Sequence, residues 1–230
     1  TALSGTLTVY LDPDRKAAFG RKDLAPIANH NVDAGAVGVK TDSPFKTITD
    51  LVDAAKKNPK SLKTATDGLM GSDHMATLYF QKVTGADFSL VHFDGGAPAS
   101  TALAGGHVDL RVGKVGSLLS MVKSGQVRIL GVMDKQESRL IPDAKTLEAQ
   151  GYKGYYWYNA TGFSAPAATP KEIINTISAA MKRALESEEH KKKLEEVALM
   201  ASYMSPDEYA TYWNQYEEIV KPLIPIAKQQ

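Results

Sequence analysis

The sequence of 230 residues contains no cysteine. Disulfide scaffolds, cysteine zinc sites, iron–sulfur clusters and cysteine nucleophiles are therefore excluded. Neither sign of charge predominates. The chain has 27 Lys and Arg residues and 26 Asp and Glu residues, which leaves a formal net charge of +1. Nucleic-acid-binding proteins normally carry a basic stripe, so we expect no nucleic-acid partner. No apolar run approaches the roughly 18–20 residues of a membrane helix, so we expect no direct membrane insertion.

Apolar residues are plentiful enough for a folded core. Hydrophobic residues make up 43% of the chain and charged residues 23%, which argues against disorder. A chain of this length holds one large domain or two modest lobes. No N-terminal signal peptide is visible, but a secreted protein would have lost it, so composition leaves the compartment open.

Motifs of common enzymes are missing. The sequence has no G-x-S-x-G elbow and no G-x-G-x-x-G loop. Gly113-Lys114 resembles part of a phosphate-binding loop, but Val115 stands where Ser or Thr is needed. Asp73-His74 lies beside Ser72, yet neighbouring residues on a helix point about 100° apart, which is a weak signal for a nucleophile and its base.

The five histidines do not form an H-x-x-x-H motif. His92-x-Asp94 and His107-x-Asp109 are candidate ligand pairs for a metal. The simpler interpretation places them at strand ends, in contact with backbone or solvent. We therefore predict no metal and no cofactor.

Short apolar runs alternate with amphipathic stretches up to residue 133. Strands are predicted at 36–39, 62–66, 88–93, 108–112 and 127–133, and the helices between them begin near Thr47, Ser72, Pro98 and Ser117. Thr47 with Asp50 forms a capping box, and Gly85 ends the helix that starts at Ser72. This alternation predicts an α/β fold with a mostly parallel sheet and helices on both faces.

The pattern changes in the last third of the chain. It predicts an extended stretch over 155–165, followed by three helices in a row. Capping boxes are predicted at Thr169-Pro170-Lys171-Glu172 and at Ser205-Pro206-Asp207-Glu208, and Ser187 is the predicted cap of the helix between them.

Three turns with glycine precede helices at the carboxyl ends of successive strands. They are residues 66–72, 94–98 and 114–117. Open α/β sheets bind ligands at this edge, and helix N-termini offer free N–H groups and partial positive charge. For any single turn, a simple cap is the plainer explanation. Three on one edge favour a site for a small anion.

The motifs around these turns resemble a known family. Residues 93–99 and 103–109 are similar to the Y-x-G-G-x-P-A and L-x-G-G-x-V-D signature of the solute-binding receptors of tripartite tricarboxylate transporters, the Bug-type proteins. Residues 22–28, 71–76, 124–130, 137–152 and 165–170 resemble further family segments in the same order. Phe93 stands where Tyr is usual, and Arg111 and Lys114 bring positive charge to a strand end that is usually neutral.

The resemblance implies a two-lobed periplasmic-binding-protein fold of the Venus flytrap type II class. Lobe 2 would span 36–158, and lobe 1 would combine 1–35 with 159–230. The N-terminal βαβ unit of lobe 1 has no counterpart here, so we expect an incomplete lobe or chain. The stripe of Tyr209, Tyr212, Trp213 and Tyr216 would then be only partly buried.

The implied function is a periplasmic, non-enzymatic and monomeric receptor. It would deliver a small di-, tri- or aromatic carboxylate to the membrane subunits of a tripartite transporter. An enzyme or an effector-binding regulatory domain on the same architecture stays an alternative. The resemblance and the turns together assign ligand binding to Ser4, Thr66, Met70, Gly71, Ser72, His74, Phe93, Asp94, Gly95, Gly96, Ala97, Lys114, Trp157 and Asn159.

Overall fold

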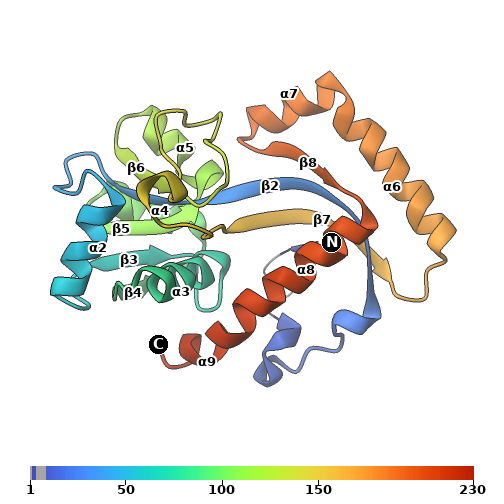
Figure 1. Ribbon diagram of the computed structural model, residues 1–230, viewed down its shortest axis with the longest axis horizontal. Helices are drawn as coiled ribbons and strands as arrows, with labels where there is room; N and C mark the ends of the chain where they lie inside the picture. Colours follow the sequence, from blue (N-terminus) through green and yellow to red (C-terminus); the bar gives the residue numbers. More distant parts are fainter. Residues whose placement is uncertain (1, 4–8) are drawn as a thin grey trace. The chain divides into compact units, whose positions relative to one another are not determined.

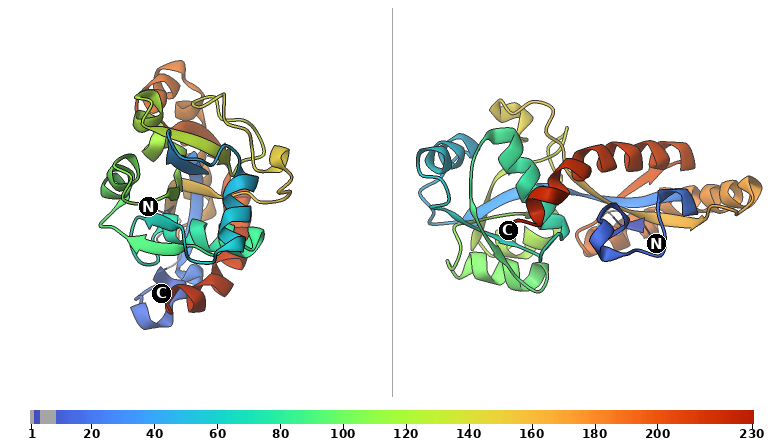
Figure 2. Two further views of the ribbon diagram at one scale, coloured as in Figure 1. Left: turned by 90° about the vertical axis from the view of Figure 1, so that its left-hand side faces the viewer. Right: turned by 90° about the horizontal axis from the view of Figure 1, so that it is seen from below.

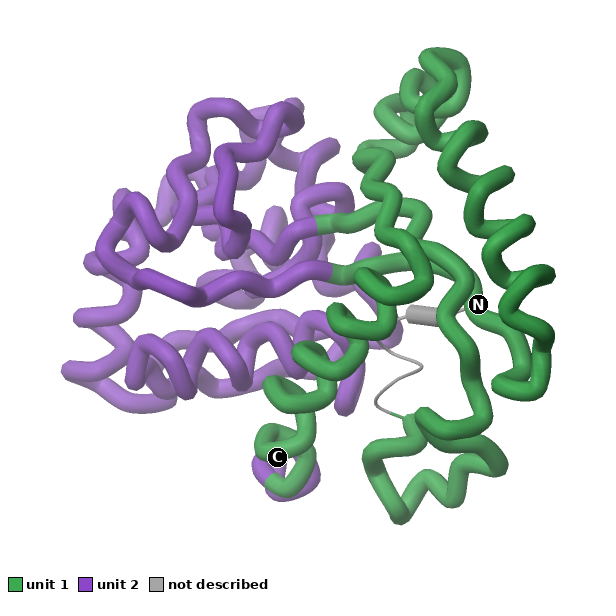
Figure 3. The backbone as a smooth tube through the Cα atoms, turned by 45° about the vertical axis from the view of Figure 1, so that its right-hand side comes forward, with its two compact units in different colours: residues 1–33, 159–225 green, residues 34–158, 226–230 purple. Residues whose placement is uncertain are grey.

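The computed structural model describes residues 2–3 and 9–230 of the chain. The backbone divides into two compact units (Figure 3). Unit 1 comprises Thr1–Asp33 and Asn159–Pro225, and unit 2 comprises Ala34–Tyr158 and Ile226–Gln230. Residues 226–230 thus group with unit 2 rather than with the segment that precedes them. None of the helices in the described part of the chain has the length and apolar character that a membrane crossing requires.

Unit 2 is built on a sheet with the strand order β6-β2-β5-β3-β4 (Figure 1). Its strands are β2 (Leu24–Lys40), β3 (Lys63–Thr66), β4 (Ser89–His92), β5 (Leu110–Lys114) and β6 (Val127–Val132). Only the second half of the long strand β2 takes part. Its residues 35–39 pair with β5, and its residues 36–40 pair with β6.

This sheet is mixed, whereas the sequence predicted a mostly parallel one. Strands β4, β3 and β5 run parallel, but β2 is antiparallel to both of its neighbours, β5 and β6. Since β5 and β6 both oppose β2, they run in the same direction, with β2 inserted between them. Alternation of strands and helices predicts the direction of successive strands but not whether they are neighbours. The inserted strand was therefore not apparent from the sequence.

Helices α3 (Ser72–Thr84), α4 (Gly96–Ala104) and α5 (Val115–Lys123) pack on the strands of this sheet. Helix α2 (Ile48–Lys57) and the 3₁₀ turn η3 (Glu148–Gln150) reach it at Gly131 of β6, where an added Cβ would meet the Ile48 and Gln150 side chains. The predicted capping box of α2 is confirmed, since Asp50 N–H donates to Thr47 Oγ1 at 3.1 Å and Thr47 N–H donates to Asp50 Oδ2 at 2.9 Å. The core beneath the helices is apolar. Phe80 of α3 stacks on Phe88 with ring centroids 6.1 Å apart, and both side chains are buried.

Unit 1 contains a sheet ordered β1-β7-β2-β8, which uses the first half of β2. Its other strands are β1 (Ala2–Leu3), β7 (Tyr158–Pro166) and β8 (Met200–Met204). The prediction of three helices in a row is wrong, because β8 separates the second from the third. The segment Met-Ala-Ser-Tyr-Met has little β-branched character, and its antiparallel pairing with β2 makes it a strand.

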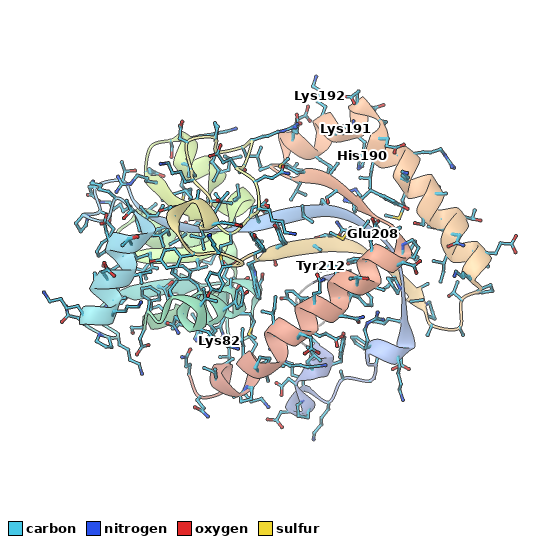
Figure 4. The ribbon with its side chains drawn as sticks, in the orientation of Figure 1. Lys82, His190, Lys191, Lys192, Glu208 and Tyr212 are labelled. Atoms are coloured by element: carbon cyan, nitrogen blue, oxygen red, sulfur yellow. The ribbon has the colours of Figure 1, made fainter. Side chains whose placement is uncertain are left out.

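The helices of unit 1 are α6 (Lys171–Glu186), α7 (Glu188–Glu196) and α8 (Pro206–Val220), with 3₁₀ turns η1 (Pro13–Arg15), η2 (Arg21–Asp23) and η4 (Lys221–Leu223); α9 (Ile224–Ala227) ends in unit 2. The predicted box at Ser205 is confirmed, with Glu208 in the first turn of α8 (Figure 4). Ser187 caps α7 as predicted. The box at Thr169 is wrong, because Pro170 itself is the N-cap and no side chain accepts a bond there.

Three of the four residues of the aromatic stripe of α8 are buried and Tyr212 is half-buried, whereas we expected the stripe as a whole to be only partly covered. Tyr209, Trp213 and Tyr216 are at most 4% exposed. Helix α8 lies against the sheet of unit 1 (Figure 2), so closely that a Cβ added at Gly162 of β7 would come within 2.7 Å of the Tyr209 ring. The Arg21 guanidinium covers the Trp213 ring at 4.5 Å from its centroid. Strand β7 and the segment around η2 therefore provide cover that the sequence did not predict.

Candidate functional site

Three helices of unit 2 begin at one edge of its sheet. Strands β4 and β5 flank β3 in parallel register, with Thr66 opposite His92 and Ala65 opposite Arg111. At the carboxyl end of β3 the chain turns into α3, at that of β4 into α4, and at that of β5 into α5. We call residues 67–72, 93–97 and 114–117 the carboxyl edge of unit 2. The predicted convergence of three helix starts is therefore found within this unit.

A buried ion pair lies under this edge. The Arg111 guanidinium donates to Asp73 Oδ2 from Nε at 3.0 Å and from Nη2 at 2.5 Å, and both side chains are at most 1% exposed. Arg111 Nη1 also donates to Ser100 Oγ, and that hydroxyl donates to the Ser117 carbonyl at 3.0 Å. Since these residues belong to β5, α3, α4 and α5, one polar network joins all three helix starts.

The network places a formal positive and a formal negative charge in the interior. Burial raises the pKa of the Asp73 carboxyl, and the Arg111 guanidinium opposes this shift by favouring the carboxylate. Removing one partner of such a pair typically costs about 3–5 kcal/mol, because the other charge stays buried and uncompensated. The pair therefore makes the relative positions of the helix starts strongly dependent on both residues.

Glycines make room for the guanidinium. A Cβ at Gly113 would lie 2.8 Å from Arg111 Nε, and a Cβ at Gly96 would lie 3.0 Å from Arg111 Nη2. Both distances are shorter than ordinary van der Waals contact. Gly96, which the sequence assigned to ligand approach, thus also allows Arg111 to lie beneath the start of α4.

The start of α3 is partly occupied by the chain's own carboxylate. Asp67 Oδ1 accepts the N–H of Asp73 at 2.9 Å, and a Cβ at Gly71 would come within 2.3 Å of the same oxygen. A carboxylate at this position already uses one N–H donor of the helix and repels a second anion. Asp67 therefore competes for the place at Gly71-Ser72 where we predicted a ligand.

His74 is a buried neutral side chain that fixes this turn. Its Nδ1 accepts the N–H of Met70 at 2.8 Å, and burial lowers its pKa to about 4. Its ring lies edge-on to His92, 4.7 Å between centroids, and burial lowers the pKa of His92 as well. His92 Nδ1 is 2.6 Å from Thr66 Oγ1. Thr66, Met70 and His74 thus form the interior support of the edge.

The start of α4 is the most open of the three. Gly95 has a φ of +104°, in a region that favours glycine, and it precedes the helix as its N-cap. The N–H groups of Gly96 and Ala97 have no acceptor within the described part of the chain, and Pro98 has no N–H. Asp94 and Ala97 are exposed. Two consecutive N–H groups at a helix N-terminus are suited to the two oxygens of a carboxylate.

The other assigned residues lie at varying depth. Lys114 is half-buried, and its carbonyl accepts the Ser117 hydroxyl at 2.8 Å at the start of α5. Trp157 is buried in unit 2, with its ring 5.8 Å from that of Tyr79. Asn159 is buried in β7 of unit 1. Ser4 lies outside the described residues.

No cluster of three or more metal-ligating carboxylates and imidazoles occurs between residues 9 and 230. The pairs His92-x-Asp94 and His107-x-Asp109 accordingly lack a third such ligand in that range.

Comparison with known proteins identifies the chain's relatives. Residues 1–227 match the family described as "Tripartite tricarboxylate transporter family receptor". The chain belongs to this family. The family description is that of a transporter receptor rather than an enzyme, which sets the enzyme alternative aside.

The first curated relatives are longer than this chain. The "UPF0065 protein in tcbD-tcbE intergenic region" of Pseudomonas sp. strain P51 is 26% identical over 204 residues, which cover 88% of this chain and 61% of that protein. Protein BugT of Bordetella pertussis is 27% identical over 137 residues, covering 60% of this chain and 42% of BugT. The chain spans about three fifths of the Pseudomonas protein.

Solved structures share the fold at lower identity. A TctC solute-binding protein from Polaromonas has a TM-score of 0.84 at 23% identity, covering 97% of this chain and 76% of the other. MatC of Rhodopseudomonas palustris, solved with bound malate, has a TM-score of 0.79 at 22% identity, covering 95% and 77%. These likenesses confirm the predicted α/β periplasmic-binding fold.

The ion pair beneath the edge is the feature that sequence reasoning missed. The sequence marks Arg111 only as an unusual charge at a strand end and does not predict its orientation. Its position between Leu110 and Val112, in a strand with a buried apolar pattern, is the available signal, because an Arg in such a strand needs a buried acceptor. Asp73, one residue into a helix start, was considered only as a weak partner of His74.

Proposed function

We propose that this chain is part of a periplasmic receptor that captures a small carboxylate and delivers it to the membrane subunits of a tripartite transporter. Family membership supports the receptor role. The observation that carries the proposal is the start of α4, where the N–H groups of Gly96 and Ala97 have no acceptor in the described chain. The receptor is proposed to act as a monomer without cofactor or metal.

The start of α4 supplies two favourable contributions to anion binding. Each N–H bond to a charged acceptor contributes about 1.5–3 kcal/mol. The partial positive charge of the helix N-terminus adds to these bonds. Arg111 lies directly below Gly96, so a positive side chain supports the turn from beneath, although Asp73 balances its charge.

We infer a dicarboxylate as the preferred ligand. MatC was solved with bound malate, and another R. palustris protein, 22% identical to this chain, was solved with adipate. In this chain, Lys114 stands at the start of the neighbouring helix α5 on the same edge. An ammonium group there is suited to a second carboxylate through a charge-assisted hydrogen bond.

A charge substitution at Ala97 tests the proposal without disturbing the fold. Ala97 is exposed in the first turn of α4, where an acidic side chain stabilises a helix by about 0.3–1 kcal/mol. Ala97→Asp should therefore keep or raise the melting temperature while it repels an anionic ligand. Ala97→Asn is the matched control, with nearly the same size and no charge.

Calorimetric titration with malate and with adipate gives the readout. We expect Ala97→Asp to raise the Kd at least tenfold and Ala97→Asn to change it less than threefold. Equal Kd values for the two variants would contradict a carboxylate site at the start of α4. Consumption of the ligand during the titration would contradict a receptor.

A further inference from the structure

Unit 2 contains a cavity away from the carboxyl edge. It has a volume of about 680 Å³ and lies among α5, the first part of β6, residues 41–47 and residues 140–145. Strand β6 begins there, where Val127 pairs with Lys40 and the Thr41 N–H donates to the Gln126 carbonyl. The carboxyl edge lies at the opposite end of the strands, where Lys114 pairs with Gly35. We call this the β6 cavity.

The walls of the β6 cavity are mainly aliphatic. Leu119 and Val122 line it from α5, Ile129 from β6, and Ile141 from the loop that follows β6. Leu119 and Ile141 belong to the buried core, whereas Val122 and Ile129 are half-buried. Ligand pockets typically measure about 300–1,000 Å³ and are lined by apolar side chains with a few polar groups. The β6 cavity has this size and this character.

The charged groups around the cavity are predominantly positive. Lys46, Lys123, Arg128 and Lys145 line it, against one carboxylate, that of Asp143. Within residues 9–230, none of these five side chains forms a salt bridge. The three lysines are exposed at the rim. The cavity lining thus has four cations against one acid, and the nearest acids outside the lining are Asp42, whose pKa Lys46 helps to lower, and Asp50, which accepts the Lys46 backbone N–H.

Arg128 is held in the wall rather than free in solvent. Its Nη1 donates to the Thr41 carbonyl at 2.8 Å, and its Nη2 donates to the carbonyls of Ser43 at 3.2 Å and Phe45 at 2.6 Å. Carbonyl oxygens accept from both terminal nitrogens but leave the positive charge in place, and the buried Nε has no hydrogen-bond partner among the described residues. The guanidinium is therefore a fixed cation in the wall, supplemented by mobile ammonium groups at the rim.

We propose that the β6 cavity binds an amphipathic organic anion, with one carboxylate or sulfonate group on an aliphatic chain or aromatic ring. The apolar body would replace water at the aliphatic walls, and this removal of apolar surface from water favours binding. The single anionic group would lie among the lysines of the rim. A small dicarboxylate fits poorly, because its second charge would be placed against the aliphatic walls.

The test uses decanoate as the probe and decyltrimethylammonium, which has the same chain with the opposite charge, as the comparison. Both are titrated below the concentrations at which they form micelles. We expect decanoate to bind one site per chain and the cation to bind at least tenfold more weakly. Failure of decanoate to bind, or equal binding of the two probes, would overturn the proposal.

Variants locate the site. The double variant Lys123→Glu/Lys145→Glu reverses two exposed rim charges and should raise the Kd for decanoate at least tenfold. Lys153→Glu is the control, since Lys153 is exposed in the same unit and does not line the cavity. Val122→Trp should also weaken binding by filling the cavity, with its folding checked by circular dichroism. Unchanged binding in the rim variant would overturn the assignment.

One further comparison separates this site from the carboxyl edge. Ala97→Asp should leave the Kd for decanoate unchanged, even if the same variant no longer binds malate. Loss of decanoate binding in Ala97→Asp would place the probe at the carboxyl edge and overturn a second site.

Discussion

Replacement of Arg111 by Met tests the role of the buried ion pair under the carboxyl edge. The substitution keeps much of the side-chain volume but leaves the Asp73 carboxylate at 1% exposure without its cation. Breaking a buried pair in this way typically costs about 3–5 kcal/mol. Domains are stable by only about 5–15 kcal/mol, so this loss is a large fraction of the total.

Urea unfolding followed by tryptophan fluorescence measures the loss in unit 2. The chain has two tryptophans, Trp157 in unit 2 and Trp213 in unit 1, so a Trp213→Phe background leaves one reporter in the unit of interest. We expect Arg111→Met to lower the urea midpoint for Trp157 while the slope of the transition stays constant. Arg139→Met is the control, because Arg139 is exposed in the same unit.

The double variant Asp73→Leu/Arg111→Met distinguishes a charge effect from a packing effect. Replacing both members of a buried pair by apolar residues is often neutral or stabilising, so the double variant should be more stable than Arg111→Met alone. Additive losses in the double-mutant cycle, or a loss below about 1 kcal/mol in the single variant, would refute the reasoning.

Three further predictions concern the same edge. Because burial lowers the pKa of His74 from 6.5 to about 4, the unfolded state binds the proton first as the pH falls. Stability of unit 2 should therefore be full above pH 6.5 and decline towards pH 4 by up to about 3 kcal/mol, and His74→Asn should flatten this dependence in urea titrations at several pH values. Lys114→Met should weaken binding of malate far more than that of a monocarboxylate such as butyrate, whereas calorimetric losses of equal size would leave Lys114 without a role in selecting dianions. Gly96→Val should lower the melting temperature as well as the affinity, since its Cβ would lie 3.0 Å from Arg111, and an unchanged melting temperature would show that the guanidinium yields easily.

Local signals in the sequence predicted local structure well. The capping boxes at Thr47 and Ser205 are formed, because they depend on side chain and backbone groups within one turn. The stop at Gly85 is formed for the same reason. The start of α6 differs by one position, since Pro170 is the N-cap and Thr169 donates its N–H to Pro166 instead.

Long-range pairing decides the features that the sequence did not predict. Strand β8 depends on its partner β2, which lies more than 160 residues earlier in the chain. The insertion of β2 between β5 and β6 also depends on tertiary contacts. The order of strand, helix and strand around α5 is the same in the sequence whether or not β2 lies between β5 and β6. The burial of Tyr209 depends on Gly162, whose lack of a side chain lets β7 approach the helix.

In the candidate site, too, the sequence predicted the local features and missed those that depend on long-range contacts. The sequence indicated three helix starts at one edge, because turn chemistry is local and because strand–helix alternation predicts that successive strands run in the same direction. It did not distinguish the start of α3, where Asp67 accepts a helix N–H, from the start of α4, where Gly96 and Ala97 have no acceptor in the described chain. The pairing of Arg111 with Asp73, 38 positions apart, was equally hidden.

The central claim is that the N–H groups at the start of α4 bind a carboxylate. Nuclear magnetic resonance of the ¹⁵N-labelled chain, titrated with malate, tests it most directly. The account predicts that the amide protons of Gly96 and Ala97 shift downfield in a saturable manner, as expected for new bonds to an anion, and that Ala97→Asp abolishes the shift. If the titration with malate saturates with the largest amide shifts at other residues, and with no shift at Gly96 or Ala97, this result would contradict the account.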